Sequence, residues 1–220
     1  MGLLNRARPS PDAATSGRLL RELLYGDVPL AAWRSGSTDP VSLRFQAADA
    51  ACARGMGDQA VTVLTELASD PAVESRDRLE AWAGLRDLGV VPDRETAAQV
   101  LGVVLDVPRQ GGVDTLAGYA DGSARFVDHT GAVTVLEPGA GDLHDLVIEL
   151  VQAAARLATL TGPPVGRRPA RVASAARASI LCPGGLVIRH AEPWVLVTDP
   201  VTAPVFAAGA ALVEAMATAG

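Results

Sequence analysis

Lysine is absent from this chain of 220 residues, so all nineteen of its basic residues are arginine. A lysine Schiff base, a lysine general base and the lysine of a phosphate-binding loop are therefore impossible without a partner chain. This absence excludes pyridoxal-phosphate chemistry, P-loop nucleotide hydrolysis and kinase-type phosphoryl transfer by the chain alone. The bias toward Ala, Gly, Val and Arg is typical of a GC-rich bacterial genome, so we expect a bacterial protein.

Cysteine is also scarce, with only Cys52 and Cys182 in the whole sequence. Two distant cysteines do not make a disulfide framework, and they favour a reducing compartment. The N-terminus lacks the apolar core of a signal peptide, and no segment reaches the roughly 18 uninterrupted apolar residues that a membrane span needs. We therefore expect a soluble, cytoplasmic protein with no membrane span.

Aromatic residues make up only 4% of the chain, although 49% of it is hydrophobic. That apolar fraction is ample for a buried core, which must consist mainly of Ala, Val and Leu. The formal net charge of −6 opposes binding to nucleic acid, because such binding depends on neutralising phosphates. We expect no nucleic-acid partner.

The first 92 residues combine helical periodicity with turn residues. Residues 1–14, which are rich in proline and polar residues, are predicted to be a disordered lead-in. Apolar residues at spacings of three and four predict four helices, at about 16–25, 40–54, 58–69 and 73–88. The last two helices look like one pair from an α-solenoid, but no second copy follows at a fixed period. A small helical bundle over residues 15–92 is the expected first domain.

From residue 93 onward the pattern changes to short strands. Runs of β-branched and apolar residues predict four antiparallel strands, at about 100–107, 115–120, 124–129 and 132–137. Asp121 and Gly122 form the strongest hairpin signal in the chain. A long helix capped by Asp142 follows, with apolar residues on one face.

The last fifty residues complete the predicted second domain. We expect a hairpin around residues 183–185, a short strand in the run WVLVTD, and a helix that opens at Asp199 and Pro200. The order β-β-β-β-α-β-β-α predicts an α+β domain over residues 93–220, with helices against one face of an antiparallel sheet. The chain as a whole is thus expected to be α+β, with a helical bundle preceding the sheet.

Residues 116–126, LAGYADGSARF, carry the one resemblance that we find to other proteins. This run resembles a group of uncharacterised bacterial proteins that have a similar strand–DG–strand block followed by a helix. The resemblance covers the C-terminal half of the chain at most. It implies no known activity and assigns no functional residue.

An enzyme is one interpretation of the few nucleophilic and titratable side chains. Cys182 and His190 are placed to face each other across the predicted hairpin, and Asp199 or Asp128 can orient the histidine, as in a cysteine hydrolase. Against this, Cys182 lies in the apolar run SILCP, where cysteine behaves as a small hydrophobic residue. No catalytic family signature surrounds it. Cys182, His190 and Asp199 are therefore candidates only for this alternative.

The other histidines do not indicate a metal site. His129 lies in a predicted turn, where polar residues are common for backbone reasons. His144 lies beside Asp142 and Asp145, but adjacent positions on a helix do not point to one centre. The sequence lacks both HExxH and CxxC spacing. We predict no metal and no cofactor.

Four arginines form the only basic cluster: Arg167, Arg168, Arg171 and Arg177. An exposed arginine group can bind carboxylate or phosphate in a forked geometry, on a partner protein or on a small ligand. The alternative is that this proline-rich connector is simply solvated, as most charge runs are.

Our leading hypothesis from the sequence is a non-catalytic interaction protein, an adaptor or accessory subunit in a bacterial cytoplasmic assembly. Another protein is the expected partner, and a homo-oligomer is the alternative assembly. Two further hypotheses stay open: a cysteine hydrolase that uses Cys182 and His190, and a sensor in which the arginine cluster closes on a small anionic ligand.

Overall fold

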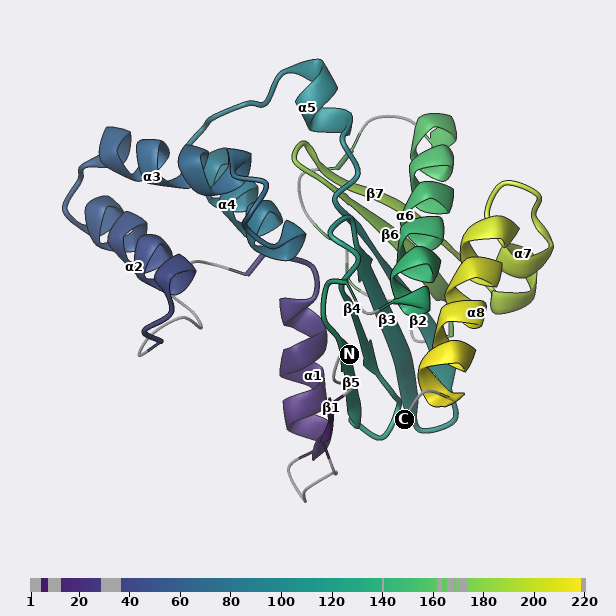
Figure 1. The fold of residues 1–220 in the computed structure, drawn as a ribbon. Helices are drawn as coiled ribbons and strands as arrows, with labels where there is room; N and C mark the ends of the chain where they lie inside the picture. Colours follow the sequence, from purple (N-terminus) through teal and green to yellow (C-terminus); the bar gives the residue numbers. More distant parts are fainter. Residues whose placement is uncertain are drawn as a thin grey trace.

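The computed structural model describes residues 5–7, 13–28, 37–139, 141–161, 164–165, 168, 170 and 174–218. In these residues the protein is α+β, with N-terminal helices followed by an antiparallel sheet against which helices pack (Figure 1). The predicted fold class is confirmed. From the second strand onward, strands and helices follow the predicted order, with one additional short helix before the last.

The first four helices begin and end within a few residues of the predicted positions, and a short fifth helix follows them. They are α1 (Ala13–Leu23), α2 (Pro40–Ala53), α3 (Gly57–Ser69), α4 (Ser75–Asp87) and α5 (Arg94–Ala98). Side-chain caps fix two of these starts. Asp39 accepts a hydrogen bond from the Ser42 amide at 2.9 Å, and Asp93 accepts from two amides at the start of α5. These caps satisfy amides that have no partner within the helix.

The sheet has seven strands among the described residues, in the spatial order β1-β5-β4-β3-β2-β6-β7, with every neighbouring pair antiparallel. The strands are β1 (Asn5–Ala7), β2 (Gly102–Arg109), β3 (Gly112–Tyr119), β4 (Ala124–Val127), β5 (Val133–Leu136), β6 (Ala176–Cys182) and β7 (Gly185–Ala191).

Strand β1 lies within residues 1–14, the segment predicted to be a disordered lead-in. Its three residues pair with β5, with Arg6 opposite Thr134. An outer strand offers unpaired backbone groups to any extended segment, so this pairing needs no apolar pattern in the added segment. Composition alone therefore could not reveal it.

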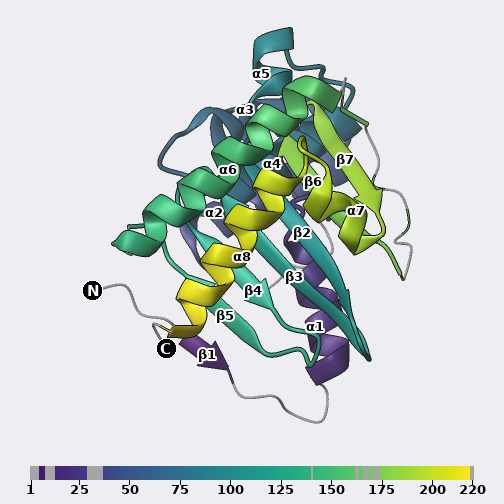
Figure 2. The ribbon, with the colours of Figure 1, turned by 90° about the vertical axis from the view of Figure 1, so that its right-hand side faces the viewer.

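Three helices cover one face of the sheet: α6 (Asp142–Thr161), α7 (Pro193–Thr198) and α8 (Ala203–Thr218) (Figure 2). Helix α7 corrects the short strand predicted in WVLVTD. Pro193 occupies its first turn, and the Asp199 amide donates to the Val195 carbonyl. Helix α8 begins later than predicted, because the Asp199 carboxylate accepts the Val201 amide at 2.7 Å and closes a turn there.

The first turn of α6 packs against the turn between β3 and β4. Gly122 has φ of +81°, in the left-handed region that glycine adopts without strain. A Cβ at this position would lie 1.9 Å from His144 Nδ1. The half-buried His144 therefore packs directly on the hairpin turn.

The opposite face of the sheet packs against α1 and α4. Leu24 and Tyr25, which follow α1, and Leu79 of α4 share an apolar cluster with the sheet. Its sheet members include Val104, Ala117, Tyr119 and Leu181. These contacts cross the boundary predicted at residue 92, so the division into domains 15–92 and 93–220 stays a prediction.

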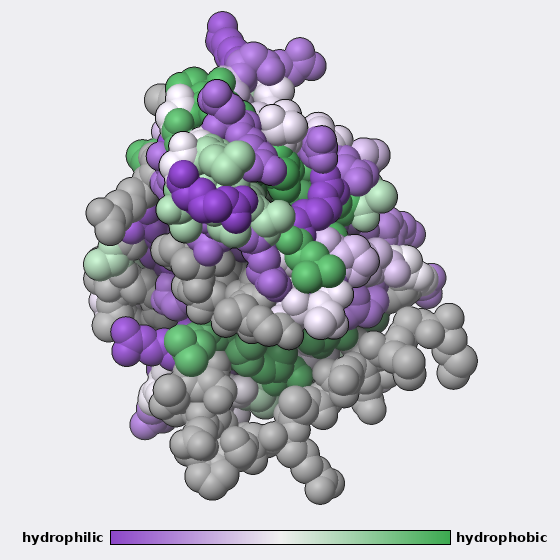
Figure 3. Space-filling model, turned by 90° about the vertical axis from the view of Figure 1, so that its left-hand side faces the viewer, coloured by the Kyte–Doolittle hydropathy of each residue, from purple (hydrophilic) through white to green (hydrophobic). Residues whose placement is uncertain are grey.

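A third apolar cluster holds α2, α3 and α4 together, with Phe45, Leu64, Leu67 and Leu85 fully or almost fully buried. On the outer face of these helices, hydrophilic residues are interspersed with apolar ones (Figure 3). This helical layer therefore has its own core beside the sheet.

Candidate binding sites

A cavity of about 300 Å³, which we call the arginine cavity, lies between α1 and the sheet. Four arginines and two carboxylates are among its lining residues, which are Arg18, Arg21, Glu22, Tyr25, Asp106, Val113, Arg168 and Arg177. They come from α1 and the residues just after it, from strands β2, β3 and β6, and from position 168. The cavity therefore depends on the tertiary fold.

A buried ion pair forms the floor of the arginine cavity. Asp106 and Arg177 are register partners on β2 and β6, with Oδ2 and Nη2 2.9 Å apart. Both residues are buried, at 2% and 5% exposed. Thr115 donates to the second carboxylate oxygen of Asp106 at 2.8 Å. Both oxygens of this buried carboxylate therefore accept hydrogen bonds, which offsets part of the cost of removing it from water.

Tyr25 connects this floor to α1. Its hydroxyl donates to Asp106 Oδ2 at 2.8 Å and accepts from Arg177 Nη2 at the same distance. Burial, reinforced by the charge of Asp106, raises the pKa of Tyr25 well above its ordinary value. The hydroxyl is therefore a stable donor at any physiological pH.

Arg168 forms one wall. Its guanidinium lies 3.8 Å from the centre of the Tyr25 ring, in a cation–π contact. It pairs with Asp27 at 3.2 Å and also with Glu22. Burial alone would lower the pKa of Arg168, but these two carboxylates outweigh it and raise the pKa.

Arg18 and Arg21 reach the cavity from α1, three residues apart and so on one side of the helix. Arg21 donates to the carbonyl oxygens of Val113 and Asp128, which anchors α1 on the strands. Arg18 is exposed and makes no hydrogen bond or ion pair with any described residue. Its guanidinium is thus available to a ligand.

The predicted arginine cluster is only partly assembled here. Arg168 and Arg177 line the same cavity, whereas Arg167 and Arg171 lie outside the described residues. Sequence reasoning missed Arg18 and Arg21, together with Tyr25 and Asp106. One signal was present, because Asp106 is the only charged residue in the apolar run VLGVVLDVP.

A second cavity, the apolar pocket, has about 230 Å³ and lies on the other face of the sheet beneath α7 and α8. Leu105, Leu116 and Phe126 line it from the sheet, and Phe206 and Val213 from α8. Gly209 lets α8 come this close, because a Cβ there would lie 2.5 Å from Leu105 Cδ1. The pocket is consequently lined almost entirely by hydrocarbon.

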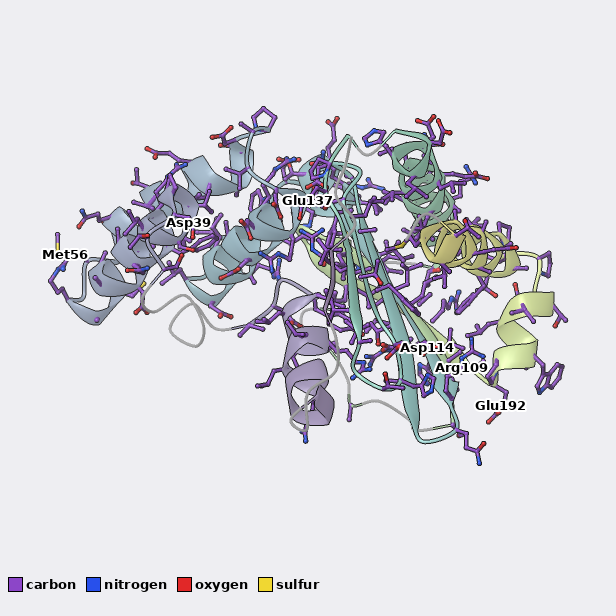
Figure 4. All side chains as sticks on the ribbon, turned by 60° about the horizontal axis from the view of Figure 1, so that its bottom comes forward. Asp39, Met56, Arg109, Asp114, Glu137 and Glu192 are labelled. Atoms are coloured by element: carbon purple, nitrogen blue, oxygen red, sulfur yellow. The ribbon has the colours of Figure 1, made fainter. Side chains whose placement is uncertain are left out.

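Polar groups gather at one end of the apolar pocket. Arg109 Nε donates to Asp114 Oδ2 at 2.6 Å, and His129 Nδ1 lies 3.1 Å from Asp114 Oδ1. Arg109 and Asp114 lie together at the end of the β2–β3 hairpin, with Glu192 at the same end of the sheet (Figure 4). Burial alone would raise the pKa of Asp114, but hydrogen bonds from Arg109 and His129 outweigh it and lower the pKa.

His129 is not arranged as a catalytic base. In the described part of the chain no serine, threonine or cysteine hydrogen-bonds to its ring. The adjacent Asp128 serves the turn instead, accepting from the Thr130 and Ala132 amides. The Asp114–His129 contact therefore holds the loop against the sheet.

Helix α7, which borders the apolar pocket, carries exposed hydrocarbon. Trp194 is 68% exposed and Val197 is 55% exposed, both on the single short helix α7. Val197 and the adjacent Pro193 also line the pocket. A large aromatic side chain left in water beside an open apolar pocket is typical of a protein interaction site.

The cysteine-hydrolase candidates are not brought together. In the β6–β7 hairpin Cys182 pairs with Gly185, whereas His190 pairs with Arg177, so the two lie at opposite ends. The expectation that they face each other was wrong, because the chain reverses tightly just after Cys182. Burial raises the pKa of the Cys182 thiol to about 11, although Arg86 opposes this. Asp199 serves the turn before α8.

Metal ligation finds no support in the described residues, since no three or more His, Cys, Asp or Glu side chains are grouped suitably. None of the described helices combines the length and apolarity needed to cross a membrane. Comparison with known protein families, curated proteins and solved structures finds no match to this chain.

Proposed function

We propose that this protein is a non-catalytic interaction subunit, an adaptor or accessory component of a bacterial cytoplasmic assembly, that binds another protein through α7 and the apolar pocket. The observation that carries the proposal is the exposed Trp194, on the helix whose Pro193 and Val197 line the pocket. Tryptophan is one of the residues most enriched at interface hot spots, where truncation of one side chain costs about 2 kcal/mol or more.

The surroundings indicate what kind of partner fits. The pocket takes an apolar side chain, and the polar groups of Arg109, Asp114 and Glu192 provide the hydrated rim that surrounds most interface cores. Arg109 and Asp114 neutralise each other. Glu192 is exposed and makes no ion pair with a described residue. The partner segment is thus an apolar anchor flanked by a basic residue.

Two matched variants test this function. Trp194→Ser removes the side chain that is proposed to contact the partner. Leu160→Ser removes an apolar residue of α6 that is equally exposed, at 66%. A photo-crosslinker at position 197 in the native host is expected to capture one defined protein. Trp194→Ser should abolish that capture, whereas Leu160→Ser should leave it intact.

Other results would contradict the proposal. Capture that survives Trp194→Ser would mean that α7 is not the docking site. If light scattering shows a dimer that dissociates in Trp194→Ser, the partner is a second copy of this chain rather than another protein.

The enzyme alternative has weaker support. A thiol nucleophile needs an exposed thiolate and a base within hydrogen-bonding distance. Cys182 is 2% exposed, and its pKa is raised rather than lowered. The cysteine hydrolase therefore ranks below the interaction subunit.

A further inference from the structure

We propose that the arginine cavity binds a small phosphorylated ligand. The cavity lies on the face of the sheet opposite the apolar pocket, so this proposal does not rest on the protein-docking function. It concerns Arg18, Arg21, Arg168 and Arg177, the four arginines that line this cavity.

Charge is the first argument. Each of the two lining carboxylates is already paired with a lining arginine, Asp106 with Arg177 and Glu22 with Arg168. Arg18 and Arg21 add two more guanidiniums on one side of α1. The lining therefore carries an excess of positive charge, in a protein whose net charge is −6. An anion in the cavity relieves the repulsion between these like charges.

Preorganisation is the second argument. Arg177 is fixed by Asp106 and Tyr25, and Arg168 by Glu22 and Asp27 as well as by the Tyr25 ring. Donors that are already held in place lose little conformational entropy when a ligand binds. The exposed guanidinium of Arg18, which makes no hydrogen bond or ion pair with a described residue, can then also bind the ligand.

The number of donors favours a phosphoryl group over a carboxylate. A single guanidinium fork satisfies the two oxygens of a planar carboxylate. Several forks from different directions match the three terminal oxygens and the higher charge of a phosphoryl group. The volume of about 300 Å³ is at the lower end for small-molecule sites, which indicates a ligand of modest size.

Pyrophosphate is a suitable probe, titrated by calorimetry into the full chain at constant ionic strength, with citrate as the carboxylate comparison. We expect saturable one-to-one binding of pyrophosphate and weaker binding of citrate. Arg18→Gln should weaken pyrophosphate binding about tenfold or more, the usual effect of losing a charge-assisted hydrogen bond. Arg18→Lys, which keeps the charge and loses the fork, should have an intermediate effect.

Arg94→Gln is the matched control, because Arg94 is also an exposed helical arginine but lies on α5. Both substitutions remove one charge from the surface and should leave the thermal midpoint nearly unchanged. The proposal is overturned if pyrophosphate does not bind saturably at millimolar concentration, or if citrate binds more tightly. It is equally overturned if Arg18→Gln has no effect, or if Arg94→Gln weakens binding by the same factor.

Discussion

Leu105 and Asp106 are neighbours on strand β2, yet their side chains lie on opposite faces of the sheet and in opposite surroundings. Leu105 packs with apolar residues of the sheet, α6 and α8. Asp106 hydrogen-bonds to Tyr25, Thr115 and Arg177 on the face covered by α1. The α8 face is therefore an apolar core, whereas the α1 face contains a buried polar network.

The difference shows how each face holds its helices. Burial of hydrocarbon is non-directional, so the α8 face is stabilised by area and close packing. The α1 face has an apolar cluster as well, but it also depends on a complete Asp106 network, since a buried charge without its partner is costly. Such a network fixes the position of α1, and with it the arginines that α1 carries into the cavity.

The largest expected effect is on the α1 face. Asp106→Ala should lower the free energy of unfolding by about 3–5 kcal/mol, because it leaves the Arg177 charge buried without its carboxylate. Urea denaturation of both proteins measures the difference. Asp87→Ala, at an exposed position near the end of α4, is the control and should change stability by less than about 0.5 kcal/mol.

A double variant distinguishes the stability lost with the ion pair itself from the cost of leaving one buried charge without its partner. Asp106→Leu with Arg177→Met replaces both charges by hydrocarbon and should cost less than Asp106→Ala alone. A loss below about 1 kcal/mol in Asp106→Ala would mean that water reaches Arg177, and the contrast between the two faces would then disappear.

Local sequence patterns account for most of the fold. The Asp121 and Gly122 turn and the long helix from Asp142 each follow from a few adjacent residues, and both form, although Asp142 is the first residue of the helix rather than the capping residue before it. Helix α7 was missed because WVLVT is rich in β-branched and aromatic residues, which are typical of strands. Its helical state depends on Pro193, which is visible in the sequence. It also depends on the absence of a strand partner there among the described residues, which only the tertiary structure shows.

The candidate sites were harder to predict than the fold. Arg168 and Arg177 stood out because they belong to a visible cluster, but Arg177 is buried in β6 rather than exposed. Arg18 and Arg21 reach the cavity only because α1 docks on the sheet, where Arg21 contacts Val113 of β3 and Asp128 just after β4, and no local pattern encodes that contact. The exposure of Trp194 likewise depends on where α7 lies.

On the α8 face we expect a somewhat smaller effect of a different kind. Leu212 is fully buried in the apolar core, so Leu212→Ala should lower the free energy of unfolding by about 3 kcal/mol through lost burial and a cavity. The loss should be the same at low and high salt, since no charge is involved. Leu160→Ala, at an exposed position, should cost less than about 0.5 kcal/mol. A marked salt dependence for Leu212→Ala would show that this face is not purely apolar.

The smallest expected effect concerns Cys182, an ionisable group buried in the apolar core of the α8 face. Cys182 has no carboxylate or histidine partner among the described residues, and burial raises the pKa of its thiol to about 11. The folded protein thus favours the neutral thiol. Its contribution to stability is complete below the unfolded-state pKa, about 8.5, and is lost as the pH rises through about 11. No change in stability from this group is expected at neutral pH.

Iodoacetamide modification, followed by mass spectrometry, tests this difference in reactivity. At pH 8 Cys182 should react much more slowly than the half-buried Cys52, and its rate should rise as the pH approaches 11. In urea both cysteines should react at similar rates, which is the internal control. Rapid modification of native Cys182 at pH 8 would require an accessible thiolate. The apolar face would then hold a charge without a partner, and the cysteine-hydrolase alternative would regain support.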